Sequence, residues 1–500
     1  MHCPKNRLNL SKSLFIRGLQ CHKSLYLNRY HPELKDPISE GQQRVFDSGS
    51  EVGLLARDLF PGGTEIVYKG FTPQKQLEKT ETEIRKGTAT IYEAAFEHNG
   101  VFMKTDILHK GKKGWELYEV KATTEAKDVH ISDVALQYYV LTGAGIDVSS
   151  VNLIHLNNQY VRNGAIEVDK LFVSENITEA VRDQQAIVVS EIARMREMLS
   201  GDTPPAIDID KYCEDPYLCD FMGHCWQHIP EDSVFDLKQR GARPFDLYNQ
   251  GIILMKDIPL DLVSGSQLMQ LEAFLDRKEL IDHDQVRAFL DSLWYPMYFL
   301  DFETYTTPIP AFDGLKPYQQ VPFQYSLHYI ERESADPGHH EFLAEPNVDP
   351  RPDLVDKLLR EIPENACVIA YNATFEIGRL RELAEFLSKR SVAIRTIIGN
   401  MRDLMIPFRQ GSIYHWRMKG SYSQKVVLPV LVPDLSYEGM EVANGGMAMD
   451  AYARMCRWND PAEIARIRTA LLEYCKLDTL GMVRILEKLQ GMTSPASSIG

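Results

Sequence analysis

The chain has 500 residues, of which 44% are hydrophobic and 25% are charged, and its formal net charge is −15. Single hydrophobic cores stop growing near about 250–300 residues, so this length predicts more than one domain. The acidic balance argues against a protein that coats nucleic acid nonspecifically, because such binding rests on Lys and Arg neutralising phosphates. It leaves room for a nuclease, whose metal sites are themselves clusters of carboxylates.

Segments typical of membrane targeting are missing from the sequence. There is no run of about 18 or more apolar residues, so we expect no transmembrane helix. Residues 1–11 are polar and lack the apolar core of a signal peptide. We therefore expect a cytoplasmic protein with no membrane partner.

The first 228 residues predict helices around a meander of strands. Strand-like runs cover 90–96 and 101–108, and His98-Asn99-Gly100 between them is a strong hairpin signal. The other elements expected here are helices at 10–30, 49–60, 128–142 and 177–199 and strands at 115–121 and 151–156.

Residues 229–294 predict a helical connector with short helices at 247–259 and 266–280. From residue 295 onward strands alternate with helices, which indicates an α/β fold. The strands are expected at 295–305, 324–330 and 368–371, and the helices at 353–361, 375–388 and 461–489.

The first group of candidate catalytic residues is Asp106, Glu119 and Lys121. Glu119 and Lys121 are two apart on a predicted strand, so both side chains point to the same face. Asp106 lies at the end of the preceding strand, and a hairpin brings the three together. Carboxylates hold Mg²⁺ or Mn²⁺ through hard oxygen ligands, and a bound metal generates a nucleophile from water near neutral pH.

This pattern, followed by Gln137 on the next predicted helix, resembles the PD-(D/E)XK nuclease superfamily. The nearer likeness is to its RecB-like branch, which includes iron–sulfur nucleases. The resemblance implies a restriction-endonuclease-like fold with Asp106, Glu119, Lys121 and Gln137 as catalytic residues. Many members carry a metal-binding His in an early G-x-x-x-H, where this chain has Gly49 and then Gly53; Glu51 and Glu93 are the candidate replacements.

The cysteines predict a second kind of site. Cys213, Cys219 and Cys225 form C-x5-C-x5-C, and Cys21 offers a fourth ligand. Four thiolates suit a [4Fe–4S] cluster or structural Zn²⁺. The nuclease branch named above has one cysteine before its core and three after it, which implies a [4Fe–4S] cluster that holds the two ends of the domain together. The wide x5 spacing leaves zinc as the alternative.

The second carboxylate group begins with Asp301 and Glu303 in an apolar run. A strand places both on one face, and burying them together is costly without a cation. Glu376 follows a later strand in Tyr-Asn-x-x-Phe-Glu. Tyr474 and Asp478 share one face of the last predicted helix, since they are i and i+4.

These segments, in this order, resemble the DnaQ-like (DEDD) 3′–5′ exonucleases of the RNase H-like fold. The resemblance implies that Asp301, Glu303, Glu376 and Asp478 hold two metal ions and that Tyr474 orients the attacking water. Glu376 stands where Asp is usual. The whole arrangement also resembles an uncharacterised bacterial family of such fusions.

The sequence therefore predicts three segments: a PD-(D/E)XK-like domain with a cysteine cluster at 1–228, a helical connector at 229–294 and a DnaQ-like domain at 295–500. We expect a metal-dependent nuclease that acts on DNA in preference to RNA, with a setting in repair or defence and with protein partners that the sequence does not identify. The alternatives are an RNA-processing exonuclease and a nucleic-acid-binding scaffold with one degenerate site.

Overall fold

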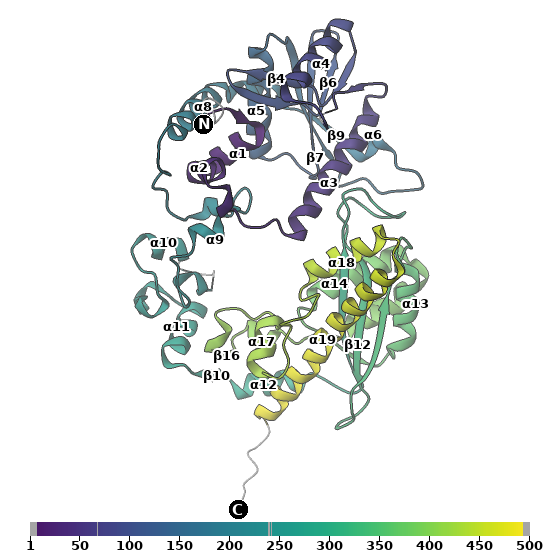
Figure 1. Ribbon diagram of the computed structural model, residues 1–500. Coiled ribbons are helices and arrows are strands. Elements are labelled where there is room, and N and C mark those ends of the chain that lie inside the picture. The colour runs from purple at the N-terminus through teal and green to yellow at the C-terminus, as the bar shows by residue number, and fades with distance from the viewer. Residues whose placement is uncertain (1–7, 68, 239–240, 242, 494–500) are drawn as a thin grey trace, which may run out of the picture. The chain divides into compact units, whose positions relative to one another are not determined.

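The computed structural model describes residues 8–67, 69–238, 241 and 243–493 (Figure 1). The chain divides into two compact units. The first comprises residues 1–228 and 307–319, and the second comprises 229–306 and 320–500. Both are α/β, with several mixed sheets. Among the described residues, no helix has the length and apolar character needed to cross a membrane.

The first unit is built on a six-stranded sheet in the order β2-β3-β6-β7-β8-β9. Neighbouring strands are antiparallel from β3 to β7, whereas β7 and β8 are parallel and are connected through helix α5. The strands are β2 (Thr64–Glu65), β3 (Thr90–Tyr92), β6 (Ile107–Lys110), β7 (Trp115–Lys121), β8 (Val148–Leu156) and β9 (Phe172–Asn176).

A smaller sheet, β1-β5-β4, completes the first unit. Its strands are β1 (Leu10–Ser11), β4 (Ala95–His98) and β5 (Val101–Lys104). The predicted hairpin is confirmed: β4 and β5 are antiparallel, and Asn99 and Gly100 between them have φ of 46° and 64°. Each long predicted strand is in fact two short ones in different sheets. The break falls at Glu93, whose φ is 56°, and opposite it at Asp106.

The helices of the first unit differ from expectation at several places. The helix predicted for 49–60 covers 40–56, and the helix at 73–86 was not predicted. The single helix predicted for 10–30 is two helices, because Cys21 is extended and its thiol accepts the backbone N–H of Ser24 to begin the second. The helix predicted for 177–199 also breaks, at Gln184. The observed helices are α1 (Lys12–Gln20), α2 (His22–Tyr30), α3 (Glu40–Ala56), α4 (Pro73–Lys86), α5 (Asp128–Gly143), α6 (Val168–Leu171), α7 (Thr178–Asp183), α8 (Gln185–Leu199) and α9 (Met222–Cys225).

The second unit contains a five-stranded sheet in the order β13-β12-β11-β14-β15. Strand β12 is antiparallel to both of its neighbours, whereas β11, β14 and β15 are parallel to one another. The strands are β11 (Met297–Tyr305), β12 (Val321–Ile330), β13 (Gly338–Leu343), β14 (Cys367–Ala370) and β15 (Met401–Asp403). A two-stranded sheet pairs β10 (Glu279–Ile281) with β16 (Ile413–His415).

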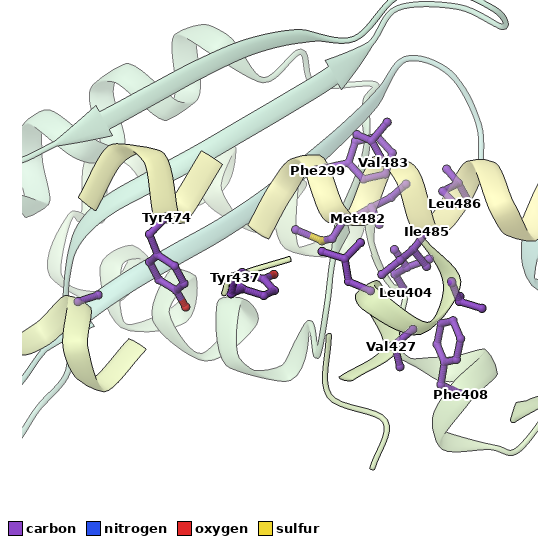
Figure 2. Close-up of a cluster of buried hydrophobic side chains, with 14 of the residues drawn as sticks. Phe299, Leu404, Phe408, Val427, Tyr437, Tyr474, Met482, Val483, Ile485 and Leu486 are labelled. Carbon is purple, nitrogen blue, oxygen red and sulfur yellow. The ribbon is translucent and has the colours of Figure 1, made fainter. Parts of the chain in front are cut away.

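Helices cover both faces of this sheet, and β11 shows why. Its residues alternate between two apolar clusters: Met297 and Phe299 join one, while Tyr298, Leu300 and Phe302 join the other. The first cluster packs against the long helix α19 (Pro461–Thr493), with Tyr474 and Tyr437 at one side of its aliphatic residues (Figure 2). Asp301 and Glu303 continue the alternation and so lie on the α19 face.

The remaining helices of the second unit are α10 (Pro244–Asn249), α11 (Ser266–Asp276), α12 (His283–Leu290), α13 (Arg351–Glu361), α14 (Thr374–Phe386), α15 (Ser391–Gly399), α16 (Ile406–Arg409), α17 (Gln424–Leu431) and α18 (Gly445–Arg457). The segment predicted as a connector belongs to this unit, because Ala273 and Val286 lie in its core and β10 pairs with β16.

The segment 307–319, which follows β11, belongs to the first unit. Arg162 Nη1 donates to the carbonyl oxygens of Pro310 and Ala311 at 2.9 and 2.6 Å. Tyr318 donates to the carbonyl oxygen of Ala122 at 2.5 Å, immediately after β7. The chain therefore passes between the units three times, after 228, after 306 and after 319.

Candidate functional sites

The first site is built on the face of β7 that carries Glu119 and Lys121. Glu119 is 1% exposed and accepts at Oε1 from Lys121 Nζ at 2.7 Å, on the same strand face. Helix α5 covers that face. Its Gln137 donates to Glu119 Oε2 at 2.8 Å, and its Asp133, one turn earlier, accepts from Lys121 at 2.5 Å. Glu119, Lys121 and Gln137 are thus brought together as the sequence predicted, and Asp133 joins them.

Asp106 lies at the break between β5 and β6 and reaches the same place. Its Oδ2 accepts the backbone N–H of Val120 at 2.7 Å. Burial, together with the nearby Glu119 carboxylate, raises the pKa of Asp106 to about 7. Asp106 and Glu119 both line a cleft of about 1190 Å³.

Lys12, the first residue of α1, is a member of this site that the sequence did not reveal. Its Nζ donates to Glu119 Oε1 at 2.7 Å and lies 3.8 Å from Asp133 Oδ2. Burial alone favours the neutral form of Glu119, but Lys12 and Lys121 outweigh it and hold its pKa well below the usual range. Both Glu119 oxygens are therefore engaged, and a divalent cation at Glu119 has to displace an ammonium group.

Two acceptor atoms of the described part of this site have no hydrogen-bond partner. Among the described residues, Asp133 Oδ1 and Gln137 Oε1 are buried without a hydrogen-bond partner. Buried polar atoms are normally satisfied, so such atoms mark a place for water or an ion. Asp133 Oδ1 and Gln137 Oε1 are thus the free acceptors around Glu119, although no three carboxylates of this site bring oxygen atoms within 4.8 Å of one another in the described structure.

The two candidates for an extra metal ligand have different positions. Glu93 lines the cleft, where it pairs with Lys104 at 2.6 Å and with Arg57 at 3.6 Å. Glu51 is exposed on α3 and is not part of the cleft lining. Gly53 does line the cleft, and a Cβ placed there meets nothing within 4 Å. Of the two, Glu93 has the better position.

Apolar side chains are exposed along the walls of the cleft. Helix α3 contributes Val45, Phe46 and Leu54, which are 65, 57 and 57% exposed. The loop between Cys213 and Cys219 contributes Tyr217, which is 52% exposed. Apolar groups exposed beside carboxylates and lysines are typical of a binding surface.

The four predicted cysteine ligands meet at one small cavity. Cys21 approaches from the break between α1 and α2, and Cys213, Cys219 and Cys225 come from the segment around α9. Burial raises the pKa of Cys21, Cys213 and Cys225. Asp220, beside Cys219, accepts two hydrogen bonds from Arg17 at 2.5 and 2.8 Å, so the segment is also tied to α1 by polar contacts.

The spacing of these sulfurs distinguishes two kinds of metal centre. Among the described residues, no three of the four sulfur atoms lie within 4.8 Å of one another. Four thiolates around one zinc ion stand about 3.8 Å apart, given Zn–S bonds of about 2.3 Å in a tetrahedron. A [4Fe–4S] cluster takes one thiolate per iron and separates the sulfurs further. The four sulfurs as a set are thus spaced more widely than the ligands of one bound zinc ion.

The second site is organised by β11 and α19. Asp301 and Glu303 share the strand face turned to α19, and Glu303 is 7% exposed. Tyr474 and Asp478, one turn apart on α19, face them, and the Tyr474 hydroxyl interacts electrostatically with Asp478, Glu303 and Asp301. Tyr437 donates a further hydrogen bond to Asp478 Oδ1 at 2.6 Å.

Glu376 comes from the first turn of α14 and is 2% exposed. Its charge interacts with that of Asp301. Among the described residues, its Oε2 atom is buried with no hydrogen-bond partner. All five predicted residues of this site are therefore brought together. Asp403, at the end of β15, accepts the backbone N–H groups of Asn372 and Met405 at 2.9 and 3.0 Å.

In the part of the chain that the structure describes, no lysine or arginine forms an ion pair with the carboxylates of the second site as Lys12 and Lys121 do with Glu119. Burial first, and neighbouring carboxylates second, raise the pKa of Asp301, Glu303 and Glu376 well above their usual values. Burial also raises the pKa of Asp478 to about 6. Lys425 is the cation that Asp301, Glu303 and Asp478 share, and its Nζ donates to the carbonyl oxygen of Ala443 at 3.0 Å. An oxygen-rich, buried and repulsive group of this kind fits a divalent cation.

Cys475 is a second residue that sequence reasoning did not place in a site. It lies inside the Tyr-x3-Asp motif and is fully buried. Its sulfur, one oxygen of Asp301 and one of Glu303 all lie within 4.8 Å of one another. Burial and the surrounding carboxylates raise the pKa of this thiol well above its usual value.

The chain is similar to one protein family and to several bacterial proteins. The family described as "Domain of unknown function (DUF2779)" matches residues 298–423. That segment contains Asp301, Glu303 and Glu376 and ends before Tyr474 and Asp478. The match therefore covers the sheet of the second unit but not helix α19.

Relatives from Mycoplasma and Ureaplasma are similar over part of the chain. "Uncharacterized protein MG366 homolog" of Mycoplasma pneumoniae is 24% identical over 233 residues, which cover 43% of this chain and 35% of the relative. "Uncharacterized protein UU173" of Ureaplasma parvum is 26% identical over 217 residues, covering 37% and 30%. The chain thus spans about a third of the length of the curated relatives it matches.

Proposed function

We propose that this chain is a metal-dependent nuclease that hydrolyses phosphodiester bonds, in DNA rather than RNA, with one site in each unit. The observation that carries the proposal is the buried, repulsive group of Asp301, Glu303 and Glu376 with its unpartnered oxygen. Such a group is costly to fold unless a cation joins it. Carboxylates that hold divalent metals next to a tyrosine are suited to phosphodiester hydrolysis.

The topology of both units supports the two resemblances. In the second unit the strand order, counted along the chain, is 3-2-1-4-5 with only the second strand reversed, as in an RNase H-like sheet. In the first unit an antiparallel pair, a crossover helix and a parallel strand carry Asp106, Glu119 and Gln137 in that order. This is the layout that a PD-(D/E)XK site requires.

The residues of the chain then have separate roles. Divalent cations bound by the carboxylates would activate water and stabilise the leaving oxygen. In the second unit, the Tyr474 side chain lies among Asp478, Glu303 and Asp301, and we assign its hydroxyl to orient the attacking water. In the first unit, Lys121 is fixed between Glu119 and Asp133 and can stabilise charge that develops on the phosphate.

The cysteines support a structural cofactor. We assign Cys21, Cys213, Cys219 and Cys225 to a [4Fe–4S] cluster, because their sulfurs share one cavity at a spacing too wide for one zinc ion. Cys21 lies before the sheet of the first unit and the other three follow it, so the cluster would hold the two ends of that unit together. Anaerobic purification with iron and zinc analysis tests this: stoichiometric zinc without iron would contradict it.

A direct assay separates the two sites. The protein is purified anaerobically and offered labelled single- and double-stranded DNA and RNA with Mg²⁺ or Mn²⁺. We expect cleavage of DNA, with the activity of each site reduced by about 10²–10³-fold or more in Glu119→Ala or Asp301→Ala, the scale of losing one key electrostatic contact. The double variant should be inactive. If no substrate is cleaved with either metal, the nuclease proposal is wrong.

The cleft of the first unit further indicates single-stranded substrate. Phe46 and Tyr217 are exposed aromatic side chains on its walls, and base–aromatic stacking contributes about 1–3 kcal/mol per base. Bases in a duplex are not free to stack on protein. We expect Phe46→Ala and Tyr217→Ala each to weaken the binding of single-stranded DNA about tenfold in fluorescence anisotropy. Val392→Ala, an exposed position in the second unit, is the control.

A second candidate function applies to the first unit alone. Because Lys12 and Lys121 already neutralise Glu119, this unit is also suited to binding nucleic acid without cutting it. In that case Glu119→Ala leaves cleavage unchanged in the assay above, while Asp301→Ala abolishes it. Activity lost with both single variants would contradict this scaffold role.

A further inference from the structure

The second site contains a thiol for which the proposed hydrolysis has no use. Cys475 lies on α19 between Tyr474 and Asp478, with its sulfur 3.6 Å from Asp301 Oδ2. The sulfur and one oxygen each from Asp301 and Glu303 are mutually within 4.8 Å. Among the described residues, this is the one such group of possible metal ligands.

A second feature is a buried carboxylate whose charge interacts with that of Asp301. Glu376, which is 2% exposed and interacts with the Asp301 charge, keeps Oε2 buried without a hydrogen-bond partner in the described structure. A buried carboxylate oxygen is normally satisfied by a donor or a metal. The thiol therefore lies near acidic side chains that a bound cation would stabilise.

We propose that Asp301, Glu303 and Cys475 form a mixed oxygen–sulfur site for a thiophilic divalent cation such as Zn²⁺ or Cd²⁺. Mg²⁺ is a hard ion that selects oxygen ligands, whereas Zn²⁺ binds thiolate and carboxylate in one tetrahedral site, and the softer Cd²⁺ favours sulfur still more. On binding, the sulfur–metal bond forms as the thiol proton passes to solvent, and nothing is oxidised or reduced.

The inference goes beyond the proposed nuclease activity and does not rest on it, because it concerns only which cations bind. It has one consequence for hydrolysis. A thiophilic ion held by Cys475 uses the same Asp301 and Glu303 carboxylates that Mg²⁺ or Mn²⁺ requires. The two classes of ion therefore exclude each other at this site, and thiophilic ions act as inhibitors.

Cadmium titration of the full-length protein tests the site. Binding is followed by the ultraviolet thiolate-to-cadmium charge-transfer band and by calorimetry, in excess Mg²⁺. Wild type is compared with Cys475→Ser and with the matched control Cys456→Ser, which changes a cysteine of the same unit outside the group. The cluster cysteines are the same in all three proteins, so their contribution cancels.

We expect Cys475→Ser to lose one equivalent of bound Cd²⁺ with its thiolate band, and Cys456→Ser to behave like wild type. Asp301→Asn keeps the thiol but should bind that equivalent at least tenfold more weakly. Circular dichroism checks that each variant is folded, and Cys475→Ala replaces the serine variant if that one is not. Equal Cd²⁺ uptake and equal bands in wild type, Cys475→Ser and Asp301→Asn would overturn the proposal.

Discussion

The two units carry carboxylate groups that are balanced in opposite ways. In the first unit, Glu119 is held between the ammonium groups of Lys12 and Lys121, each 2.7 Å from the same oxygen. In the second unit, Asp301 and Glu303 face each other and Asp478, with the single Lys425 shared among them. In the folded protein, lysines compensate the charge of Glu119, whereas Asp301 and Glu303 repel each other.

The difference follows from one position in each strand. In E-x-K the residue two places along brings a counterion to the same face, whereas in D-x-E it brings a second negative charge. The pKa of Glu119 is accordingly held low, while those of Asp301 and Glu303 are raised. We infer that the second unit depends on an external cation more strongly than the first does.

The largest expected effect is on the free energy of unfolding. Removing one carboxylate charge should destabilise the first unit and should leave the second unit equally or more stable. Glu119→Gln removes one carboxylate that both lysines contact and leaves them only Asp133, at 2.5 Å from Lys121 and 3.8 Å from Lys12. Breaking a buried ion pair costs about 3–5 kcal/mol. Because Lys12 and Lys121 remain 28% and 22% exposed, we expect a loss near the lower end, about 3 kcal/mol. Asp301→Asn, in metal-free protein, relieves repulsion and should leave the second unit equally or more stable.

Hydrogen–deuterium exchange in the full-length protein reads the units separately, through peptides from β7 and from β11. The expected pattern is faster exchange in β7 for Glu119→Gln and unchanged or slower exchange in β11 for Asp301→Asn. Glu279→Gln, at an exposed position of β10, controls for the loss of a negative charge. Destabilisation of the same size in both units would remove the contrast between them.

Local periodicity explains the part of each site that the sequence predicted. Glu119 with Lys121, Asp301 with Glu303, and Tyr474 with Asp478 are each separated by a spacing that fixes their common face. The Asn99-Gly100 hairpin, which returns the chain toward Asp106, could be predicted because both residues readily adopt a positive φ. The α/β class followed from the alternation of strands and helices, and it is confirmed.

What the sequence did not predict depends on contacts between distant segments. Lys12 is 107 residues from Glu119, and a lysine at a helix start has no distinguishing pattern. The docking of 307–319 in the first unit likewise rests on long-range contacts such as Tyr318 with Ala122. Asp133 is different: it is one turn before Gln137 on α5, so the helical period could have found it.

Removing the Lys12 ammonium group would leave the carboxylates of the first site with fewer counterions, as in the second site. Lys12→Met frees one contact to Glu119 Oε1 and leaves Lys121 in place. A unit charge at about 4 Å changes an interaction by about 1–4 kcal/mol between water and a protein surface. We expect Mn²⁺ to bind about tenfold more tightly, as measured by calorimetry in an Asp301→Asn background that weakens the second site.

Lys127→Met is the matched control, since Lys127 lines the same cleft. It should change Mn²⁺ affinity less than Lys12→Met does, because no ion pair between Lys127 and these carboxylates is found among the described residues. Equal effects of the two substitutions would mean that general charge in the cleft, and not the Lys12–Glu119 contact, controls cation binding.

Two histidines behind the second site are kept neutral by folding. His328 on β12 accepts or donates a hydrogen bond with Thr479 of α19 at 2.7 Å, and its ring lies 4.4 Å from that of His339. Burial, His339, Lys476 and Arg484 lower the pKa of His328 to about 3. Burial and Lys476 likewise lower the pKa of His339 to about 4.

This pair predicts how acid acts on the second unit. A histidine in an unfolded chain has a pKa of about 6.5, so below that pH the unfolded state binds more protons than the folded one. Stability is therefore complete above pH 6.5 and falls toward pH 3, by about 1.4 kcal/mol per pH unit for each histidine. Hydrogen–deuterium exchange in β12, at constant high ionic strength, measures how stability depends on pH. His328→Gln should reduce this dependence by the contribution of one histidine. His340→Gln, at a partly exposed neighbouring position, should leave it unchanged. An unchanged slope in His328→Gln would show that carboxylate protonation at Asp301 and Glu303, which has the opposite sign, controls the second unit in this range.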